Sequence, residues 1–250
     1  MRYIGGKNRI AKDIVPIILQ TNPDIVVEPF CGALNVTVEL IKQKPGLYVF
    51  ASDNHCDLIE MWKAIQNGWL PPLELDREEY NALKLQSSSV LRTFAGYGCS
   101  FSGKWFGGYA NDKTNRNYCL NARNSILKKV PYLKNVIFSH GDYSSRPIPK
   151  NSIVYCDPPY FGTTKVGEGN SFDHKEFWQW VNSLKVECYV SEYVAPHHFQ
   201  VIWEKQVKTD MNTKDGNNTR TEKLFCKSMT KQINSNNFSN EFWKDESVSN

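Results

Sequence analysis

The sequence predicts an α/β protein with a mostly parallel, doubly wound sheet. Short apolar runs rich in Val, Ile and Tyr alternate along the chain with amphipathic stretches, as strands and helices alternate in such folds. Most of these runs are continuous rather than alternating, which is typical of strands covered on both faces. A chain of 250 residues can form one large domain of this class with an insertion.

Each predicted strand is one of the short apolar runs. They are Ile25–Glu28, Tyr48–Ser52, Val136–Ser139, Ile153–Cys156, Glu187–Ser191 and Leu224–Lys227. The amphipathic stretches predict helices over Arg9–Leu19, Asn35–Lys42, Asn54–Asn67, Arg77–Leu85, Ala122–Val130 and Lys175–Leu184. Two helix starts have the spacing of a capping box, Asp76 with Glu79 and Asp173 with Glu176.

The alternation fails between about residues 68 and 118. The stretch Phe94–Ala110 holds six aromatic residues and five of the fifteen glycines of the chain, which favours an inserted lobe over another strand–helix unit. We predict a catalytic domain of residues 1–60 and 134–228, with a mainly helical insert of residues 61–133. Residues 229–250 are rich in Asn, Ser and Lys and predict a disordered polar tail.

Composition limits the class of protein. Apolar residues make up 40% and charged residues 22%, as in soluble globular proteins. No apolar run approaches the ~18 residues of a membrane helix, and Asp13 interrupts the only early apolar stretch, so we expect neither a membrane span nor a secretory signal. The seven cysteines form no Cys-x-x-Cys pair, which indicates reduced thiols, a cytoplasmic location and no zinc module. The histidines form no ligand pair, so no metal site is predicted.

Charge is unevenly distributed along the chain. Residues 77–150 hold 12 Lys and Arg against 4 Asp and Glu, whereas the whole chain has a net charge of +4. Such a segment suits contact with a polyanion. A solvated basic face explains it equally well.

Two neighbouring strands are predicted to end in carboxylates. Glu28 ends one apolar run and is followed by Pro29, Phe30 and Gly32, while the next run ends at Asp53. Acids at this edge can accept hydrogen bonds from ribose hydroxyls. Because no G-x-G-x-x-G follows, we favour an adenosyl ligand without a pyrophosphate. Strand-end acids also serve as helix caps.

A third predicted strand delivers Asp157, Pro158, Pro159 and Tyr160. The two prolines stiffen the loop and remove two N–H donors, so a carboxylate and a carbonyl can both accept from one exocyclic NH₂ group. Tyr160 offers a flat face for a base. The plain alternative is a Pro-rich strand exit with a surface Asp. At the start of the chain, Tyr3-Ile-Gly-Gly-Lys7 resembles an anion-binding turn, although a flexible terminus would look the same.

The order of these motifs resembles DNA adenine-N6 methyltransferases of the alpha-group, D12 type. In that family a GGK segment, a methyl-donor loop (EPF-x-G), a target-recognition insert and DPPY follow one another, as here from Tyr3 to Tyr160. The resemblance implies a Rossmann-like S-adenosylmethionine-dependent methyltransferase fold, with the insert as the target-recognition lobe. It implies S-adenosylmethionine as cofactor and duplex DNA as partner. One departure is Leu34, where family members often have a second glycine.

The resemblance also assigns roles to particular residues. It implies donor contacts by Tyr3, Gly5, Gly6, Lys7, Glu28, Pro29, Phe30, Gly32, Asp53, Asp142, Tyr143 and Asp157. The catalytic loop would be Asp157, Pro158, Pro159 and Tyr160. Candidates for DNA contacts in the insert are Arg92, Lys104, Trp105, Lys113, Asn115, Arg116, Asn117 and Arg123. Trp105 and Phe106 are equally well interpreted as a wedge at a flipped base or as core aromatics.

The activity expected from these motifs is methyl transfer to N6 of a flipped-out adenine in duplex DNA, as in a restriction–modification system. Asp157 and the Pro158 carbonyl would accept hydrogen bonds from the amine and stabilise the charge that develops on it. Alternatives are cytosine N4 or RNA adenine as the acceptor, and a non-catalytic DNA-binding protein with a decayed donor site, which Leu34 would explain. A glutamine methyltransferase is disfavoured because those enzymes resemble this pattern with Asn in place of Asp157. The G-x4-G-K spacing of Gly98 to Lys104 lacks the following Ser or Thr of a phosphate loop and a strand before it.

Overall fold

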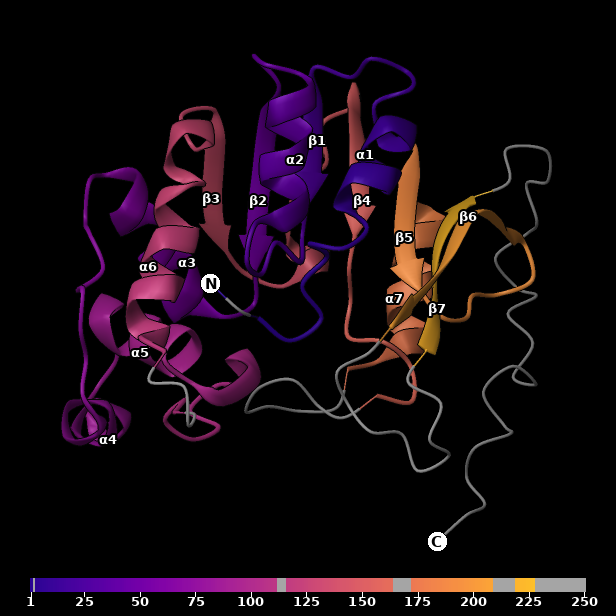
Figure 1. The fold of residues 1–250 in the computed structure, drawn as a ribbon. Helices are drawn as coiled ribbons and strands as arrows, with labels where there is room; N and C mark the ends of the chain where they lie inside the picture. Colours follow the sequence, from indigo (N-terminus) through magenta and orange to yellow (C-terminus); the bar gives the residue numbers. More distant parts are fainter. Residues whose placement is uncertain (2, 112–115, 164–171, 209–218, 228–250) are drawn as a thin grey trace, which may run out of the picture.

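A computed structural model describes residues 1, 3–111, 116–163, 172–208 and 219–227. The sheet in these ranges has seven strands in the order β3-β2-β1-β4-β5-β7-β6 (Figure 1). The strands are β1 (Ile25–Glu28), β2 (Tyr48–Asp53), β3 (Val136–His140), β4 (Ser152–Cys156), β5 (Cys188–Glu192), β6 (Phe199–Lys208) and β7 (Thr219–Lys227). The pairs among β1 to β5 are parallel, whereas β7 runs antiparallel to β5 and to β6. The expected mixed α/β sheet is thus confirmed.

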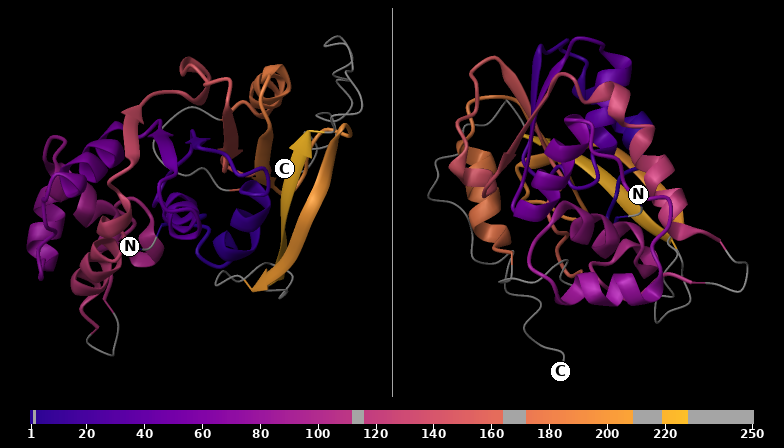
Figure 2. Two further views of the ribbon diagram at one scale, coloured as in Figure 1. Left: turned by 90° about the horizontal axis from the view of Figure 1, so that it is seen from above. Right: turned by 90° about the vertical axis from the view of Figure 1, so that its left-hand side faces the viewer.

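Helices cover the two faces of the sheet unequally. The helices are α1 (Ala11–Ile18), α2 (Asn35–Gln43), α3 (Cys56–Gln66), α4 (Arg77–Leu85), α5 (Val90–Gly98), α6 (Tyr118–Leu127) and α7 (His174–Ser183), with 3-10 turns at Phe101–Gly103, Val130–Tyr132 and Tyr143–Ser145. Figure 2 shows α1 and α2 on one side of the sheet and α7 on the other. The larger apolar cluster includes residues of α1, α2 and α3, while the smaller one centres on Phe177 and Trp178 of α7.

The helices between β2 and β3 share the larger core with the sheet. Phe94, Tyr97 and Phe106 are buried in the same apolar cluster as Val26 and Leu58. The start of α4 has the predicted capping box, because Asp76 accepts from the Glu79 amide at 2.7 Å and Glu79 accepts from the Asp76 amide at 2.9 Å. None of the helices in the described ranges is long and apolar enough to cross a membrane.

Two elements were not predicted from the sequence. Strand β6 is exposed along most of its length, and only Phe199 of this edge strand is fully buried, so it lacks an apolar run. Helix α5 begins at Ser89, whose side chain accepts from the Arg92 amide at 3.1 Å, and it ends among glycines. The predicted tail, residues 229–250, lies outside the described residues.

Candidate active site

Four carboxylates meet at one edge of the sheet because parallel strands end there together. Glu28 ends β1, Asp53 ends β2, Glu192 ends β5 and Asp157 directly follows β4. In an open parallel sheet, this carboxyl edge is where ligands bind. The loop after β1 and the loop after β4 lie on neighbouring strands, so two ligands bound over them would be adjacent.

Asp53 fixes the loop that follows β1. Its two carboxylate oxygens accept from the Gly32 amide and the His55 amide, each at 3.0 Å. Burial raises the pKa of this carboxyl, and the two amides oppose the rise. Gly32 has a φ of +45°, and a Cβ there would lie 3.0 Å from the Tyr3 ring, so the position requires glycine. Asp53 is thus held rigidly and is only partly exposed at the carboxyl edge.

The same loop is anchored from the core side. The indole of Trp62 donates to the Gly32 carbonyl at 2.9 Å, and the ammonium of Lys129 donates to the Ala33 carbonyl and the Asn35 side chain at 2.5 Å. Lys129 is only 8% exposed, and this burial lowers its pKa to about 8. Leu34 has a φ of +58° and is completely buried. The loop therefore keeps a left-handed turn even with leucine at this position.

Glu28 faces the interior rather than the open edge. It is 2% exposed and its carboxylate accepts a short hydrogen bond from the Thr37 hydroxyl. Burial raises the pKa of Glu28 to about 8, while the bond from Thr37 opposes the rise. Pro29 is buried beside it. This arrangement does not support a direct contact between the Glu28 side chain and a methyl donor. It supports a role for Glu28 in holding the loop.

The N-terminal segment packs over Gly32 in the loop after β1. The rings of Tyr3 and Tyr97 lie 5.0 Å apart, and the Gly6 amide donates to the Tyr3 carbonyl at 3.1 Å. A Cβ at Gly6 would come within 2.8 Å of the Asn35 side chain. Gly5 has a φ of +75° and leads the chain into Lys7. The predicted Tyr3–Lys7 turn therefore lies at the carboxyl edge, against the loop after β1.

Lys7 links this segment to the loop after β4. Its ammonium contacts the Asp157 carboxylate at 2.6 Å, donates to the Gly5 carbonyl at 2.9 Å and lies 4.5 Å from the centre of the Tyr160 ring. Lys7 is 7% and Asp157 is 18% exposed. Burial raises the pKa of Asp157 to about 6, and Lys7 limits that rise. At neutral pH the carboxylate is thus mostly ionised and can accept hydrogen bonds from an amine.

Side chains from β5 and β7 hold the remainder of this loop. The Tyr160 hydroxyl donates to Glu222 at 2.8 Å, and the Phe161 amide donates to the buried Glu192 at 3.0 Å. Glu192 also accepts from the Tyr193 amide at 2.7 Å, and burial raises its pKa to about 7. Pro158 and Pro159 lie between Asp157 and Tyr160. The loop is therefore fixed at both ends by ionisable groups.

An aromatic cluster lies beside the loop after β1. The ring of Phe30 stacks on Tyr143 with centroids 5.5 Å apart, and Phe177 packs edge-on against both. Asp142 is exposed and accepts from the Ser144 amide at 2.9 Å. The expected donor residues Phe30, Asp142 and Tyr143 thus lie near one another after β1 and β3.

The predicted DNA-contact residues have different environments. Arg92 lies 3.5 Å from Asp57 and over the ring of Trp105, which also packs against Tyr97. A Cβ at Gly96 would collide with Trp105 at 2.6 Å. Trp105 is half-buried and Phe106 is buried, so in this structure both are packing aromatics.

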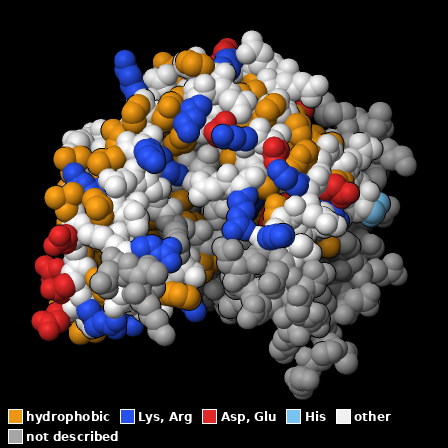
Figure 3. All heavy atoms as spheres, viewed as in Figure 1, with side chains coloured by type: hydrophobic (Ala, Val, Ile, Leu, Met, Phe, Trp, Pro, Cys, Tyr) orange, Lys and Arg blue, Asp and Glu red, His pale blue; other side chains and the backbone are white. Residues whose placement is uncertain are grey.

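Two other candidates bind the backbone of the insert itself. Arg123 donates a short hydrogen bond to the Pro71 carbonyl, and Asn117 caps α6 by accepting from the Leu120 amide at 2.7 Å. Lys104 and Arg116 are exposed, whereas Lys113 and Asn115 lie outside the described residues. Lys and Arg side chains spread over much of the face in Figure 3, while Asp and Glu side chains gather over α4.

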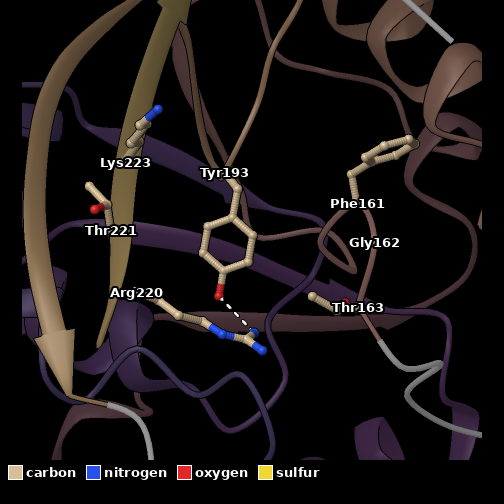
Figure 4. A pocket seen from close by; sticks show the side chains of 7 residues that line it. All are labelled: Phe161, Gly162, Thr163, Tyr193, Arg220, Thr221 and Lys223. Atoms are coloured by element: carbon tan, nitrogen blue, oxygen red, sulfur yellow. Dashed lines mark hydrogen bonds between the residues drawn. The ribbon is translucent and has the colours of Figure 1, made fainter. Parts of the chain in front are cut away.

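An open pocket of about 490 Å³ adjoins the loop after β4. Figure 4 shows Tyr193 and Arg220 meeting in its middle, between β7 and the segment Phe161–Thr163. Arg220 donates to the Tyr193 hydroxyl at 3.3 Å. Thr221 and Lys223 complete the lining. The sequence did not predict this pocket or the carboxylates Glu192 and Glu222, because neither carboxylate lies in a recognisable motif.

The comparisons with known proteins concern one part of the chain and the overall fold. The family model of the D12 class N6 adenine-specific DNA methyltransferases matches residues 3–89. That range includes the Tyr3–Lys7 turn, the loop after β1 and Asp53, and it ends before Asp157. No curated protein matches the sequence.

Several solved structures are similar in fold at low sequence identity. The rRNA methyltransferase AviRa of Streptomyces viridochromogenes has a TM-score of 0.45 and 15% identity, with 90% of this chain and 86% of that one covered. A putative RNA methyltransferase of Pyrococcus horikoshii has a TM-score of 0.43 and 11% identity, with 87% and 82% covered. The precorrin-6y C5,15-methyltransferase of Geobacter metallireducens has a TM-score of 0.40 and 10% identity, with 87% of both covered. The fold of this chain is the mixed α/β class that the sequence predicted, with a seven-stranded sheet in the described residues.

Proposed function

We propose that the protein transfers a methyl group from S-adenosylmethionine to N6 of adenine in duplex DNA. The observation that carries the proposal is the position of Asp157, a largely enclosed carboxylate on a proline-stiffened loop beside the Asp53–Gly32 loop. The match of residues 3–89 to adenine-specific DNA methyltransferases supports the choice of donor and acceptor. The expected division into a catalytic domain and an insert at residues 61–133 remains part of this proposal.

The donor would bind over β1 and β2. Asp53 would accept from the ribose hydroxyls, and Phe30 with Tyr143 would pack against the adenine ring beside Asp142. Tyr3 covers Gly32 and would hold this loop in place for the ligand. S-adenosylmethionine supplies an activated methyl group on a cationic sulfonium, so the protein needs no strong base. Its residues must align the acceptor with that methyl group.

The acceptor amine would bind at Asp157. Its lone pair is delocalised into the ring, and hydrogen bonds from the amine to Asp157 and to the Pro158 carbonyl favour a tetrahedral nitrogen. The carboxylate then stabilises the positive charge that develops on nitrogen. Lys7 now contacts both Asp157 and one face of Tyr160. The incoming base must therefore displace the ammonium or stack on the other face of the ring.

A target within a duplex must leave the stack to reach this loop, at a cost of a few kcal/mol. The insert, with exposed Lys104 and Arg116, would contact the DNA. Arg92, Trp105, Asn117 and Arg123 would support its shape through the internal contacts described above. Under these assignments, Lys104 and Arg116 would contact the DNA backbone and position the duplex, while other residues would read the bases.

The test is transfer of labelled methyl from S-adenosylmethionine to plasmid DNA and to total RNA, followed by nucleoside analysis. The proposal predicts N6-methyladenine in DNA. Label in N4-methylcytosine, in RNA alone or in neither would contradict it and favour the corresponding alternative. Asp157→Ala should reduce turnover by about a hundredfold or more, and Asp173→Ala, an exposed helix cap, should leave it nearly unchanged.

A further inference from the structure

The pocket beside the loop after β4 contains an arginine whose charge has no carboxylate partner among the described residues. Arg220 is half-buried, and its guanidinium donates to the neutral Tyr193 hydroxyl and lies 5.7 Å from the centre of that ring. Within the part of the chain that the structure describes, these contacts leave several of its five N–H donors available. A planar guanidinium facing an open pocket suits a doubly coordinated oxyanion such as a phosphate.

The framework around Arg220 is fixed. Strand β7 pairs with β5 on one side and β6 on the other, and Arg220 is two residues before Glu222, which accepts from the Tyr160 hydroxyl. Phe161, Gly162 and Thr163 continue from the proposed catalytic loop into the pocket wall. A ligand held at Arg220 would therefore lie beside the loop that carries Asp157.

The pocket and the proposed methyl-donor site lie over different strands of the sheet. The loop over Asp53 and Gly32 follows β1 and β2, whereas the pocket lies over β5 and β7, on the far side of β4. The carboxylate of the donor is thus a poor candidate for this anion. A pocket of about 490 Å³, walled by Phe161 and Tyr193, has room for a sugar as well as its phosphate.

We propose that Arg220 binds a backbone phosphate of the DNA strand that carries the target adenine, next to the extruded nucleotide. This inference rests on the proposed function and adds the contact that positions the nucleotide. The Tyr193 hydroxyl orients the guanidinium, and the aromatic walls enclose the adjoining sugar. The contact supplies position and affinity without reading the base.

The test is a double-mutant cycle between protein and DNA. A duplex containing the mapped target site is made with a neutral methylphosphonate at the phosphate on either side of the target adenine. Dissociation constants are measured with S-adenosylhomocysteine present, for the wild-type protein and for Arg220→Gln. The proposal predicts that one methylphosphonate and Arg220→Gln each weaken binding about tenfold, and that the two together weaken it no further.

Matched variants separate this contact from a general loss of charge or structure. Lys150→Gln removes a cation beyond the opposite end of β4 and should leave affinity unchanged. Arg220→Lys should restore part of the affinity, and Tyr193→Phe should give an intermediate loss. Arg220→Gln should also reduce the slope of log affinity against log salt by about one, while its dissociation constant for S-adenosylmethionine stays at the wild-type value.

The outcomes distinguish the two proposals. If the wild-type protein methylates DNA but the losses from Arg220→Gln and from each methylphosphonate add, the phosphate contact is overturned and the proposed function stands. If Arg220→Gln weakens the binding of S-adenosylmethionine but not of DNA, the pocket is part of the methyl-donor site and the phosphate contact is overturned. If the wild-type protein neither binds nor methylates DNA, both proposals fail.

Discussion

The two loops at the carboxyl edge are held in different ways. The loop after β1 is fixed mainly through its own backbone, with Gly32 bonded to Trp62 and to Asp53, and Ala33 bonded to the buried ammonium of Lys129. The loop after β4 is fixed by ionisable side chains from elsewhere in the chain, namely Lys7, Glu192 and Glu222. Under the proposed function, the donor loop would be preformed by bonds to its backbone, whereas the geometry of the acceptor loop would depend on charged side chains.

The largest expected effect is the loss of Asp53. Asp53→Ala removes the acceptor of two amides and of the proposed ribose bonds, and each bond to a charged group contributes about 1.5–3 kcal/mol. We expect at least a hundredfold weaker binding of S-adenosylmethionine by calorimetry. Asp24→Ala, which removes an exposed carboxylate just before β1, should bind normally. Binding of the Asp53 variant within about threefold of wild type would refute a preformed donor site.

The next largest effect is on the pH dependence of stability, through the buried carboxyl of Glu28. Its pKa is about 8 in the folded protein against an ordinary value of 4.5, so the folded state retains a proton that the unfolded state has lost between these values. The stability contributed by this group is complete below pH 4.5 and falls as pH rises towards 8, by up to about 1.4 kcal/mol per unit.

Glu28→Gln should remove that decline. Urea unfolding at pH 6 and pH 8 should therefore show a smaller loss of unfolding free energy in the variant than in wild type. Asp157 and Glu192 also have raised pKa values, but they are present in both proteins. Their contributions to the pH dependence of stability therefore cancel when the variant is compared with wild type. Glu39→Gln, a change outside the buried site on α2, serves as control. Equal pH slopes for the wild type and Glu28→Gln would show that Glu28 is not buried in this way.

A smaller effect is expected at Lys7. Its ammonium lowers the pKa of Asp157 against the effect of burial, so Lys7→Gln should raise that pKa above about 6, by about one unit. The acidic limb of the pH profile of kcat/KM should move to higher pH accordingly. A limb that stays in place in Lys7→Gln would mean that Asp157 is not the titrating group. Lys12→Gln, on α1, should not move it.

The smallest effect tests the backbone at Leu34. Because its φ is +58°, both Ala and Gly variants lose the buried side chain, but only Gly avoids the left-handed strain. We expect Leu34→Gly to be about 1 kcal/mol more stable than Leu34→Ala in urea unfolding. The opposite order would mean that the left-handed turn is not retained.

Sequence patterns predicted the features that depend on residues close together in the chain. Continuous apolar runs located β1 to β5, and the strand-end positions of Asp53 and Asp157 followed from them. The pattern could not locate Glu222 or Arg220, because their relation to Asp157 depends on the antiparallel position of β7 beside β5. Glu192 directly follows the predicted run Glu187–Ser191, so the strand-end rule applied to it as well. The role of Trp105 could not be assigned from the sequence either, because its packing depends on contact with Gly96 in helix α5.

The central claim is that the loops after β1 and β4 bind a methyl donor and an amine-bearing base side by side. A crystal structure with S-adenosylhomocysteine and a duplex containing the mapped site tests it most directly. The account predicts ribose hydroxyls bonded to Asp53, and the exocyclic nitrogen of an extruded adenine within hydrogen-bond distance of Asp157. An adenosyl group bound away from Asp53, or a target base whose amine does not reach Asp157, would contradict it.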